Sequence, residues 1–291
     1  MKLEERVPLA RLTTIGTGGP ARWLGRPQTP DELEELLRWA DDEGIPVATV
    51  GLGSNLLAAD EGVEALVLRL EGELAGVEIS RETLTAGGGA ANAVCLHRAR
   101  AAGLGGFEFA CAIPGTVGGG VRMNAGAYGS DWKAVLSRAL VASPNGSGWL
   151  DADELGLEYR RSRLEPGQVV AAVEFRLDPR PPDEIKAEVR ELNARRKAAQ
   201  PVNRRTFGSV FKNPAHELSA GRMLEACGLK GHRIGGAQIS PRHANFIENA
   251  DGATTAEALA LMAEARRRAR EQFGVELEHE VVLLGTIGLP A

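Results

Sequence analysis

The first hundred residues alternate between apolar patterns of helical and of strand period. Residues 30–43 are predicted to form a helix, because apolar side chains recur there along one helical face. These side chains are Leu33, Leu36, Leu37 and Ala40. Thr29 and Glu32 are expected to form a capping box before the helix, and Gly44 is expected to end it.

Short apolar runs that meet glycine predict further elements in this part of the chain. Strands are expected over 47–50, 63–70 and 84–86, and a helix over 90–102. The pattern makes residues 20–70 a small α/β unit.

In the middle of the chain the periodicity of apolar residues disappears and then returns. Residues 104–130 are rich in glycine without a clear pattern, which predicts a long loop. Residues 135–177 are predicted to be rich in strands, with a hairpin turn at Asn145-Gly146 and a strand over 169–177. Further helices are expected over 183–199, 220–226 and 255–273, with Gly228 and Gly274 ending the last two.

Length and composition describe an ordinary globular chain. The 291 residues exceed one typical domain, so two or three domains are expected. A net charge of −5 argues against a general nucleic-acid binder, and the basic run at 266–270 is interpreted as an exposed helix surface. No apolar run reaches the roughly 20 residues needed to span a bilayer, and the charged N-terminus predicts no signal peptide.

The cysteines and histidines do not predict a metal site or a disulfide framework. Three cysteines lie far apart and form no CxxC pair, which suits a reducing cytoplasm. The five histidines form no HxxxH or HxH pair, so no metal is expected.

The most unusual segment is Phe207–Pro214, which combines Ser209, Lys212 and Asn213 with two phenylalanines. Surface loops are usually polar and core strands usually lack charge, so this mixture indicates a functional role. No histidine lies near Ser209, and a catalytic triad therefore has no local support.

Two glycine-rich loops could hold a phosphorylated cofactor. Gly51–Asn55 follows a predicted strand but is not a GxGxxG loop, so an ordinary tight turn explains it equally well. Ile113–Gly120 leads to Asn124–Gly129 and carries apolar residues that flexible linkers avoid. Close approach of the backbone to a bulky ligand accounts for it better. Two such loops suggest a diphosphate, as in FAD.

Two charged segments remain ambiguous on their own residues. In Tyr159–Ser162 an arginine could bind a carboxylate, although a surface salt bridge is favoured from the segment alone. Glu278-His279-Glu280 precedes an apolar run and could supply an acid, with solvated charge as the default explanation.

The motifs taken together resemble the UDP-N-acetylenolpyruvoylglucosamine reductase family of flavoenzymes, in its compact type II branch. The matching segments, in family order, are Gly51–Leu57, Ile113–Gly119, Asn124–Gly129, Tyr159–Ser162, Gly208–Pro214, Gly236–Asn249 and Leu277–Gly285. The chain departs from the family pattern at Gly120 and Arg122, at Ser130-Asp131, and in the charged residues 203–206.

The resemblance implies an α+β architecture with a vanillyl-alcohol-oxidase-type FAD-binding fold of two subdomains and a C-terminal α+β substrate domain. The expected boundaries are residues 1–75 and 76–198 for the FAD subdomains and 199–291 for the substrate domain, from which the last strand could return to the FAD half.

The same resemblance assigns the site residues. Arg160, Ser209 and Glu280 are the expected catalytic residues, with Glu280 favoured over Glu278. The expected substrate contacts are Tyr128, Tyr159, Lys212 and Asn213. The expected contacts to non-covalent FAD are Gly51, Gly53, Ser54, Asn55, Leu56, Ile113, Pro114, Gly115, Thr116, Gly118, Gly119, Asn124, Ala125 and Gly126.

The implied activity is NADPH-dependent reduction of an enolpyruvyl UDP-sugar to UDP-N-acetylmuramate for peptidoglycan, in the cytoplasm, without nucleic acid or membrane insertion. The alternatives are a flavin oxidase of the same fold and a non-enzymatic flavin or nucleotide-sugar binding module. The oligomeric state is not predicted.

Overall fold

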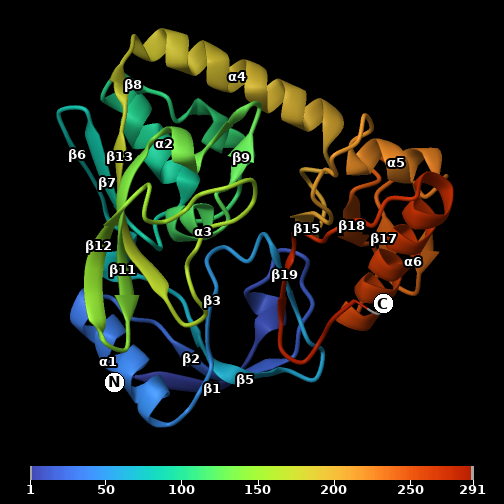
Figure 1. Ribbon diagram of the computed structural model, residues 1–291, viewed down its shortest axis with the longest axis horizontal. Coiled ribbons are helices and arrows are strands. Elements are labelled where there is room, and N and C mark those ends of the chain that lie inside the picture. The colour runs from blue at the N-terminus through green and yellow to red at the C-terminus, as the bar shows by residue number, and fades with distance from the viewer. Residues whose placement is uncertain (1, 290–291) are drawn as a thin grey trace. The chain divides into compact units, whose positions relative to one another are not determined.

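The computed structural model describes residues 2–289 and divides the chain into two compact units (Figure 1). Unit 1 contains the chain up to Glu5 together with Trp23–Leu52 and Ala65–Arg196. Unit 2 contains Arg6–Arg22, Gly53–Glu64 and the chain from Lys197 onward. The helices are α1 (Pro30–Asp42), α2 (Asn92–Ala101), α3 (Val117–Arg122), α4 (Pro182–Ala199), α5 (Ala220–Ala226) and α6 (Thr255–Phe273), with short 3-10 helices at Leu9–Arg11, Gly72–Ala75, Glu108–Ala112 and Trp132–Ala134.

Many of the strands are short. They are β1 (Leu3–Pro8), β2 (Pro20–Gly25), β3 (Val47–Thr49), β4 (Leu56–Ala58), β5 (Val63–Leu68), β6 (Val77–Ser80), β7 (Thr83–Gly87), β8 (Leu104–Gly105), β9 (Gly126–Ala127), β10 (Ser130–Asp131), β11 (Leu136–Ser143), β12 (Gly146–Asp151), β13 (Val169–Arg176), β14 (Asp178–Pro179), β15 (Thr206–Ser209), β16 (Arg233–Ile234), β17 (Ala237–Ile239), β18 (Phe246–Asn249) and β19 (Val282–Leu284).

A five-stranded antiparallel sheet in the order β12-β11-β13-β7-β6 organises unit 1. Its central strand β13 is buried on both faces, which explains its nearly unbroken apolar sequence. Val169 and Ala171 join the core that includes α1, whereas Val173 and Phe175 join the core beneath α2 and α3. A smaller sheet, β1-β2-β5-β3, contains the parallel pair β3–β5.

Helix α1 confirms the first sequence prediction. Its predicted apolar face is buried in unit 1, and the Thr29 hydroxyl accepts a hydrogen bond from the Glu32 backbone N–H at 3.3 Å. The Glu32 carboxylate, however, accepts from the Gln28 backbone N–H at 2.7 Å. The reciprocal half of the predicted capping box is therefore shifted by one residue.

The predicted structureless loop over 104–130 is wrong in part, because it contains the helix α3 and short strands. Glycine normally weakens helices, but here close packing requires it. A Cβ on Gly118 would lie 2.8 Å from the Gly88 carbonyl oxygen, and one on Gly120 would overlap the Trp132 indole. That buried indole packs against a cluster of phenylalanines, which are Phe107, Phe109 and Phe175.

The predicted hairpin is confirmed, with its turn shifted by one residue. Ser143 pairs with Gly146, so Pro144 and Asn145 form the loop, and Gly146 begins β12 with a φ of 113°. A residue with a side chain rarely adopts this backbone conformation, which explains the glycine.

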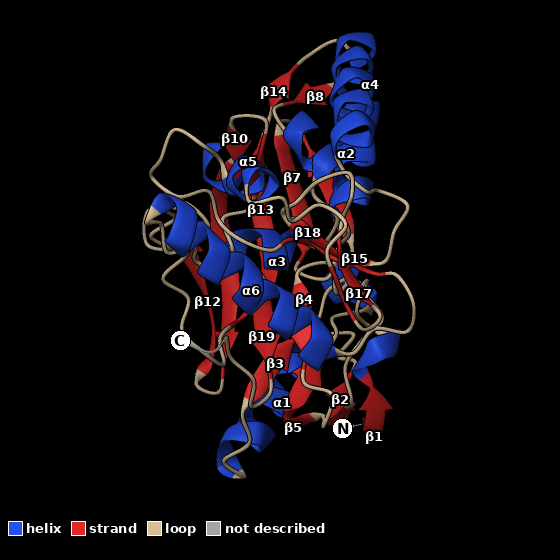
Figure 2. Cartoon of the chain, turned by 90° about the vertical axis from the view of Figure 1, so that its right-hand side faces the viewer, coloured by secondary structure: helices blue, strands red, loops and turns tan. Residues whose placement is uncertain are grey.

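Unit 2 is built on the antiparallel sheet β15-β18-β17-β16, with α6 packed on β16 and β17 beside α5 (Figure 2). Both helices match their predicted bounds. Thr254 and Glu257 form a full capping box at α6, and Gly274 ends it in the left-handed conformation. The parallel pair β4–β19 also belongs to unit 2.

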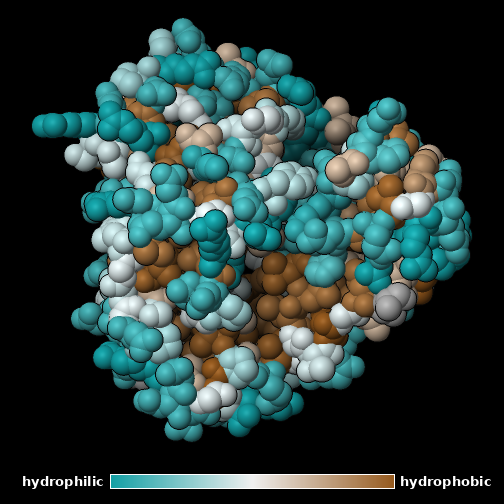
Figure 3. Space-filling model, viewed as in Figure 1, coloured by the Kyte–Doolittle hydropathy of each residue, from teal (hydrophilic) through white to brown (hydrophobic). Residues whose placement is uncertain are grey.

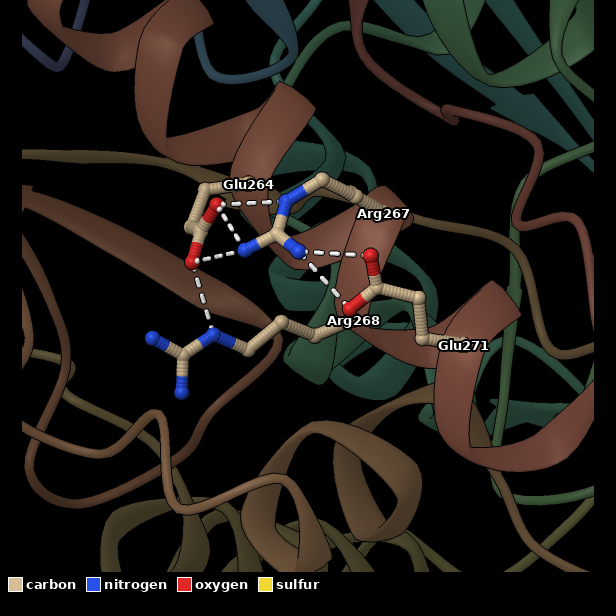
Figure 4. Close-up of polar contacts among 4 residues, drawn as sticks. All are labelled: Glu264, Arg267, Arg268 and Glu271. Carbon is tan, nitrogen blue, oxygen red and sulfur yellow. Dashed lines mark hydrogen bonds and ion pairs between the residues drawn. The ribbon is translucent and has the colours of Figure 1, made fainter.

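The basic run at 266–270 is a helix surface, as predicted. Arg267 forms ion pairs with Glu264 and Glu271 along α6, and Arg268 pairs with Glu264 (Figure 4). The space-filling view shows mainly hydrophilic residues over the outer side of this helix (Figure 3). Exposed pairs of this kind contribute little stability, typically about 0.3–0.5 kcal/mol each.

Among the described helices, none combines the length and apolar character needed to cross a membrane.

Candidate active site

The two glycine-rich loops meet in unit 1 at Gly51 and Thr116. A Cβ on Gly51 would lie 2.6 Å from Thr116 Oγ1, so no larger residue fits there without movement. Gly115 has a φ of 144°, and a Cβ on Gly119 would meet only Thr116 Oγ1, at 3.6 Å. The second loop thus combines a conformation reserved for glycine with open space beside its backbone, which fits close approach of a cofactor.

Asn92 fixes this loop from the first turn of α2, although the sequence analysis did not single it out. Its Nδ2 donates to the Ile113 carbonyl at 3.0 Å, and its backbone N–H donates to the Gly115 carbonyl at 3.0 Å. Its Oδ1 is buried and has no hydrogen-bond partner among the described residues. A buried acceptor without a partner is costly, so Asn92 is a further residue of interest at this loop.

The continuation of the first loop belongs to unit 2. A Cβ on Gly53 would collide with the Leu12 carbonyl oxygen and lie 2.7 Å from Thr13 Cα. Contacts within the protein therefore require glycine at position 53, as expected if Gly51–Asn55 is an ordinary tight turn. Asn55 donates from Nδ2 to the Glu280 carbonyl at 3.2 Å and accepts at its backbone carbonyl from Val282 N–H at 3.0 Å.

Three of the predicted cofactor contacts follow α3. The Asn124 side chain is buried, and its Nδ2 donates to Asp131 Oδ2 at 3.1 Å and to the Glu158 carbonyl at 2.9 Å. Its Oδ1 accepts from the Lys133 backbone N–H at 3.0 Å. Asn124 thus shapes the segment that contains Ala125 and Gly126, and its contribution to a ligand would come from the backbone.

Tyr128, a predicted substrate contact, lies in a groove of unit 1 along α4. Its hydroxyl donates to the Leu192 carbonyl at 3.1 Å, and the Arg195 guanidinium lies 5.0 Å from its ring centroid. Burial raises the pKa of Tyr128. The groove has a volume of about 860 Å³ and is also lined by Glu108, Arg180 and Glu188.

Arg160 lies in a tight turn from Glu158 to Arg161, closed by backbone hydrogen bonds of 3.0 and 3.1 Å between these two residues. Its φ is 55°, in the left-handed region that costs a non-glycine residue roughly 1–2 kcal/mol. The guanidinium donates to the Gly126 carbonyl at 2.8 Å and lies 5.0 Å from the Tyr159 ring centroid. Such strain often marks a functional position.

The surface salt bridge favoured for this segment is formed by the next arginine. Arg161 pairs with Glu158 at 3.2 Å, and both side chains are largely exposed. The surface ion pair is therefore present at Arg161, while the Arg160 guanidinium is held by a main-chain carbonyl, and its binding of a carboxylate stays a prediction.

In unit 2 the segments that carry Ser209 and Glu280 lie side by side. Glu280 donates from its backbone N–H to the Val210 carbonyl at 2.8 Å. Lys212 donates likewise to the Glu278 carbonyl at 2.9 Å, and Phe211 forms an antiparallel bridge with His279. Residues some 70 positions apart are thereby fixed in register, which local sequence patterns do not reveal.

Asn245 holds the same segment from its other side and was also missed. Its side-chain amide is buried and forms two bonds with Phe211, accepting from the N–H at 2.9 Å and donating to the carbonyl at 2.8 Å. Its backbone carbonyl accepts from the Val210 N–H at 2.9 Å. The only signal in the sequence was its presence in the matching segment Gly236–Asn249.

The two polar residues after Ser209 have defined partners. Lys212 Nζ forms a 2.6 Å ion pair with the Glu278 carboxylate, and the Lys212 side chain is 18% exposed. Asn213 Oδ1 accepts from the Ala220 backbone N–H at 3.1 Å, at the start of α5. The Glu278 carboxylate therefore binds the Lys212 ammonium group, which the resemblance predicts to contact the substrate.

The predicted site residues divide between the two units. Unit 1 contains Gly51, the loop Ile113–Gly119, Asn124–Gly126, Tyr128, Tyr159 and Arg160. Unit 2 contains Gly53–Leu56, Ser209, Lys212, Asn213 and Glu280. Within unit 1 the structure brings Arg160 to Gly126, and within unit 2 it brings Glu280 to Asn55 and to the Ser209 segment.

Comparison with known proteins identifies the family of this chain. Residues 22–148 match the family described as FAD binding domain, and residues 200–284 match UDP-N-acetylenolpyruvoylglucosamine reductase, C-terminal domain. The chain is 48% identical over 278 residues to UDP-N-acetylenolpyruvoylglucosamine reductase of Anaeromyxobacter dehalogenans (strain 2CP-1), covering 96% of this chain and 84% of that protein. It is 44% identical to UDP-N-acetylenolpyruvoylglucosamine reductase 2 of Symbiobacterium thermophilum, with coverage of 98% and 92%.

A solved structure agrees over the whole chain. The crystal structure of UDP-N-acetylenolpyruvylglucosamine reductase from Thermus caldophilus matches with a TM-score of 0.86 and 37% sequence identity, covering 98% of this chain and 99% of that one. These matches confirm the resemblance and the α+β flavoprotein fold predicted from the sequence. The chain belongs to the UDP-N-acetylenolpyruvoylglucosamine reductase family.

Proposed function

We propose that this chain reduces the enolpyruvyl group of UDP-N-acetylglucosamine enolpyruvate to give UDP-N-acetylmuramate, a precursor of peptidoglycan. Family membership makes it an FAD-dependent oxidoreductase that uses NADPH. The structural observation that supports this function best is the pairing of the Ser209 segment with the Glu280 segment in unit 2.

The glycine loops of unit 1 fit FAD. The glycine-only φ of Gly115 and the open side of Gly119 favour a ligand held by the backbone, and the close packing of Gly51 on Thr116 brings the first loop beside the second. When bound, FAD supplies the hydride chemistry that carries reducing equivalents from NADPH to the alkene. The remaining FAD contacts proposed from the family are those of the sequence analysis, and Gly53 among them is also required sterically by the Leu12 carbonyl.

The three catalytic residues have distinct proposed roles. Arg160 would stabilise negative charge that develops on the substrate carboxylate, because its guanidinium is already oriented by Gly126. Ser209 would donate its hydroxyl proton to the carbon next to that carboxylate. Glu280 would donate a hydrogen bond to the same developing charge.

Substrate binding is proposed to involve Tyr128, Tyr159, Lys212 and Asn213. A diphosphate that approaches Lys212 would compete with the Glu278 carboxylate now bound to its ammonium group. We further propose a cytoplasmic location, and the domain boundaries near residues 75 and 198 predicted from the sequence.

Two measurements test the activity against its alternatives. The purified protein should show a flavin absorption band that NADPH bleaches without oxygen, and the enolpyruvyl sugar nucleotide should restore it. A stable band that NADPH does not bleach favours a binding module. Rapid return of the band on adding oxygen instead of the sugar nucleotide favours a flavin oxidase.

Gly115→Val is expected to yield protein without bound flavin. Valine is disfavoured at a φ of 144°, and its side chain would fill space next to the loop backbone. The measurement is the flavin absorbance per chain after purification. Gly146→Val is the matched control, because Gly146 also has a positive φ of 113° and its Cβ would meet nothing within 4 Å. Full flavin occupancy in Gly115→Val would contradict the assignment of this loop.

A further inference from the structure

Arg122 makes an unusual set of contacts at the C-terminal end of α3. Its guanidinium donates to three main-chain carbonyls, those of Leu164 at 3.4 Å, Glu165 at 3.0 Å and Gln168 at 2.6 Å. Its own carbonyl accepts from Ser162 Oγ at 2.7 Å. One residue therefore binds the chain after Arg160 through both its side chain and its backbone. Desolvation lowers the pKa of Arg122, as burial of a cation among neutral carbonyls requires.

The turn that carries Arg160 is anchored on both sides by this part of unit 1. Before the turn, Asn124 Nδ2 donates to the Glu158 carbonyl at 2.9 Å. After the turn, Ser162 and residues 164–168 are bound to Arg122. Turns with a positive φ at the third residue usually have glycine or asparagine there. An arginine in that conformation is strained, and the bonds from Asn124 and Arg122 on either side help to hold the turn.

We propose that Arg122 is the positioning residue for Arg160, and holds the strained turn so that the Arg160 guanidinium keeps one orientation toward the substrate carboxylate. This inference rests on the proposed function. A positioning role accounts for an arginine at this place in the fold. Its guanidinium bonds to residues 164–168 are all made to neutral main-chain carbonyls. Asn92 has a different role, because it fixes the loop Ile113–Gly119.

The alternative is that Arg122 only stabilises unit 1. The two roles predict different kinetics. Loss of general stability would lower flavin occupancy, or would slow both half-reactions alike. Loss of Arg160 orientation would slow only the step in which the substrate is reduced, since NADPH reacts before the enolpyruvyl substrate is present.

The experiment compares Arg122→Met with Arg138→Met in the flavin-containing enzyme. Methionine keeps an apolar stem and removes the donors. Arg138 is the matched control, because it also lies in unit 1 and donates two bonds of 2.7 and 2.9 Å, but to Glu174. Three readouts are measured, namely flavin per chain, anaerobic bleaching by NADPH, and return of the band with substrate.

Arg122→Met should slow the return of the band about tenfold or more, because a misplacement of about 1 Å can cost about 10²-fold. Flavin content and bleaching should match Arg138→Met. Amide hydrogen exchange over residues 158–168 should become faster in the Arg122 variant alone. Arg122→Lys, which keeps a cationic donor, should recover part of the rate, and Ser162→Ala should show a smaller loss in the same step.

Equal slowing of both half-reactions, loss of flavin, or an unchanged return of the band would overturn the positioning role. If Arg122→Met does not fold, Ser162→Ala and Arg122→Lys decide the question by the same readouts. Arg160→Met separates the inference from the proposed function. If Arg160→Met leaves the return of the band unchanged, the proposed role of Arg160 fails, whereas a loss there without a loss in the Arg122 variants refutes the inference alone.

Discussion

Ser209→Ala is expected to abolish most turnover of the enolpyruvyl substrate while NADPH still bleaches the flavin. The hydroxyl proton is needed only when the carbon next to the carboxylate is protonated. Removal of a positioned proton donor typically costs about 10²–10⁴-fold in rate. The measurement is the rate at which the flavin band returns with substrate, beside the rate of bleaching by NADPH.

The fold of the Ser209 segment should survive this change. The backbones of Val210 and Phe211 are fixed by Glu280 and by the backbone and side chain of Asn245, and none of these bonds uses the serine hydroxyl. Ser147→Ala is a suitable control, because Ser147 is exposed on β12 and its hydroxyl donates to Glu34 at 2.6 Å. Near-normal substrate turnover in Ser209→Ala would mean that Ser209 is structural.

Local sequence patterns predicted two helices of unit 2 well. The bounds of α5 and α6 agree with the prediction, because their apolar periods are bracketed by side chains and glycines that act within a few residues. The prediction for the α3 region was wrong because its structure depends on contacts outside the local sequence. Its glycines favour a loop by propensity, and only contacts with Gly88 and Trp132, set by the tertiary fold, make a helix there compact.

The site residues were predicted from the motifs of the family and not from the periodicity of apolar residues. The pairing of residues 210–212 with 278–280 depends on β-type bonds between distant segments, which no local period encodes. Asn245 and Asn92 were missed for the same reason, since each side-chain amide forms a hydrogen bond with backbone atoms far from it in sequence. Arg122 was noticed only as a departure from the family pattern, and its role became visible through the carbonyls that it binds.

Gly53 illustrates how the structure can add a second reason for a glycine found in a motif. Its presence in a glycine-rich loop predicts contact with a cofactor, and the Leu12 carbonyl requires glycine there whether or not a cofactor is bound. A substitution at Gly53 would therefore report on folding of unit 2. Gly115, whose φ of 144° is itself open only to glycine, is the better test of cofactor binding.

Glu280→Gln is expected to retain clearly more activity than Glu280→Ala in the step that reduces the substrate. The Glu280 backbone is fixed on both sides, by Val210 through its N–H and by Asn55 through its carbonyl. The side chain therefore starts from a defined position beside the Ser209 segment. The substrate carries a carboxylate, and its charge grows during reduction, so an ionised Glu280 would repel it. A protonated Glu280 would instead donate a hydrogen bond.

Glutamine keeps a donor of similar length, whereas alanine removes it. Loss of one preorganised donor to a developing anion costs about 10²–10³-fold, which sets the gap expected between the two variants. In the proposed substrate complex the Arg160 cation would act in the opposite sense, because it would favour the ionised carboxylate. Glu276→Gln is the matched control, since Glu276 pairs with Arg266 at 3.2 Å and lies outside the paired segment. Equal losses in Glu280→Gln and Glu280→Ala would reject the donor role and leave Glu280 as an ionised base or a positioning residue.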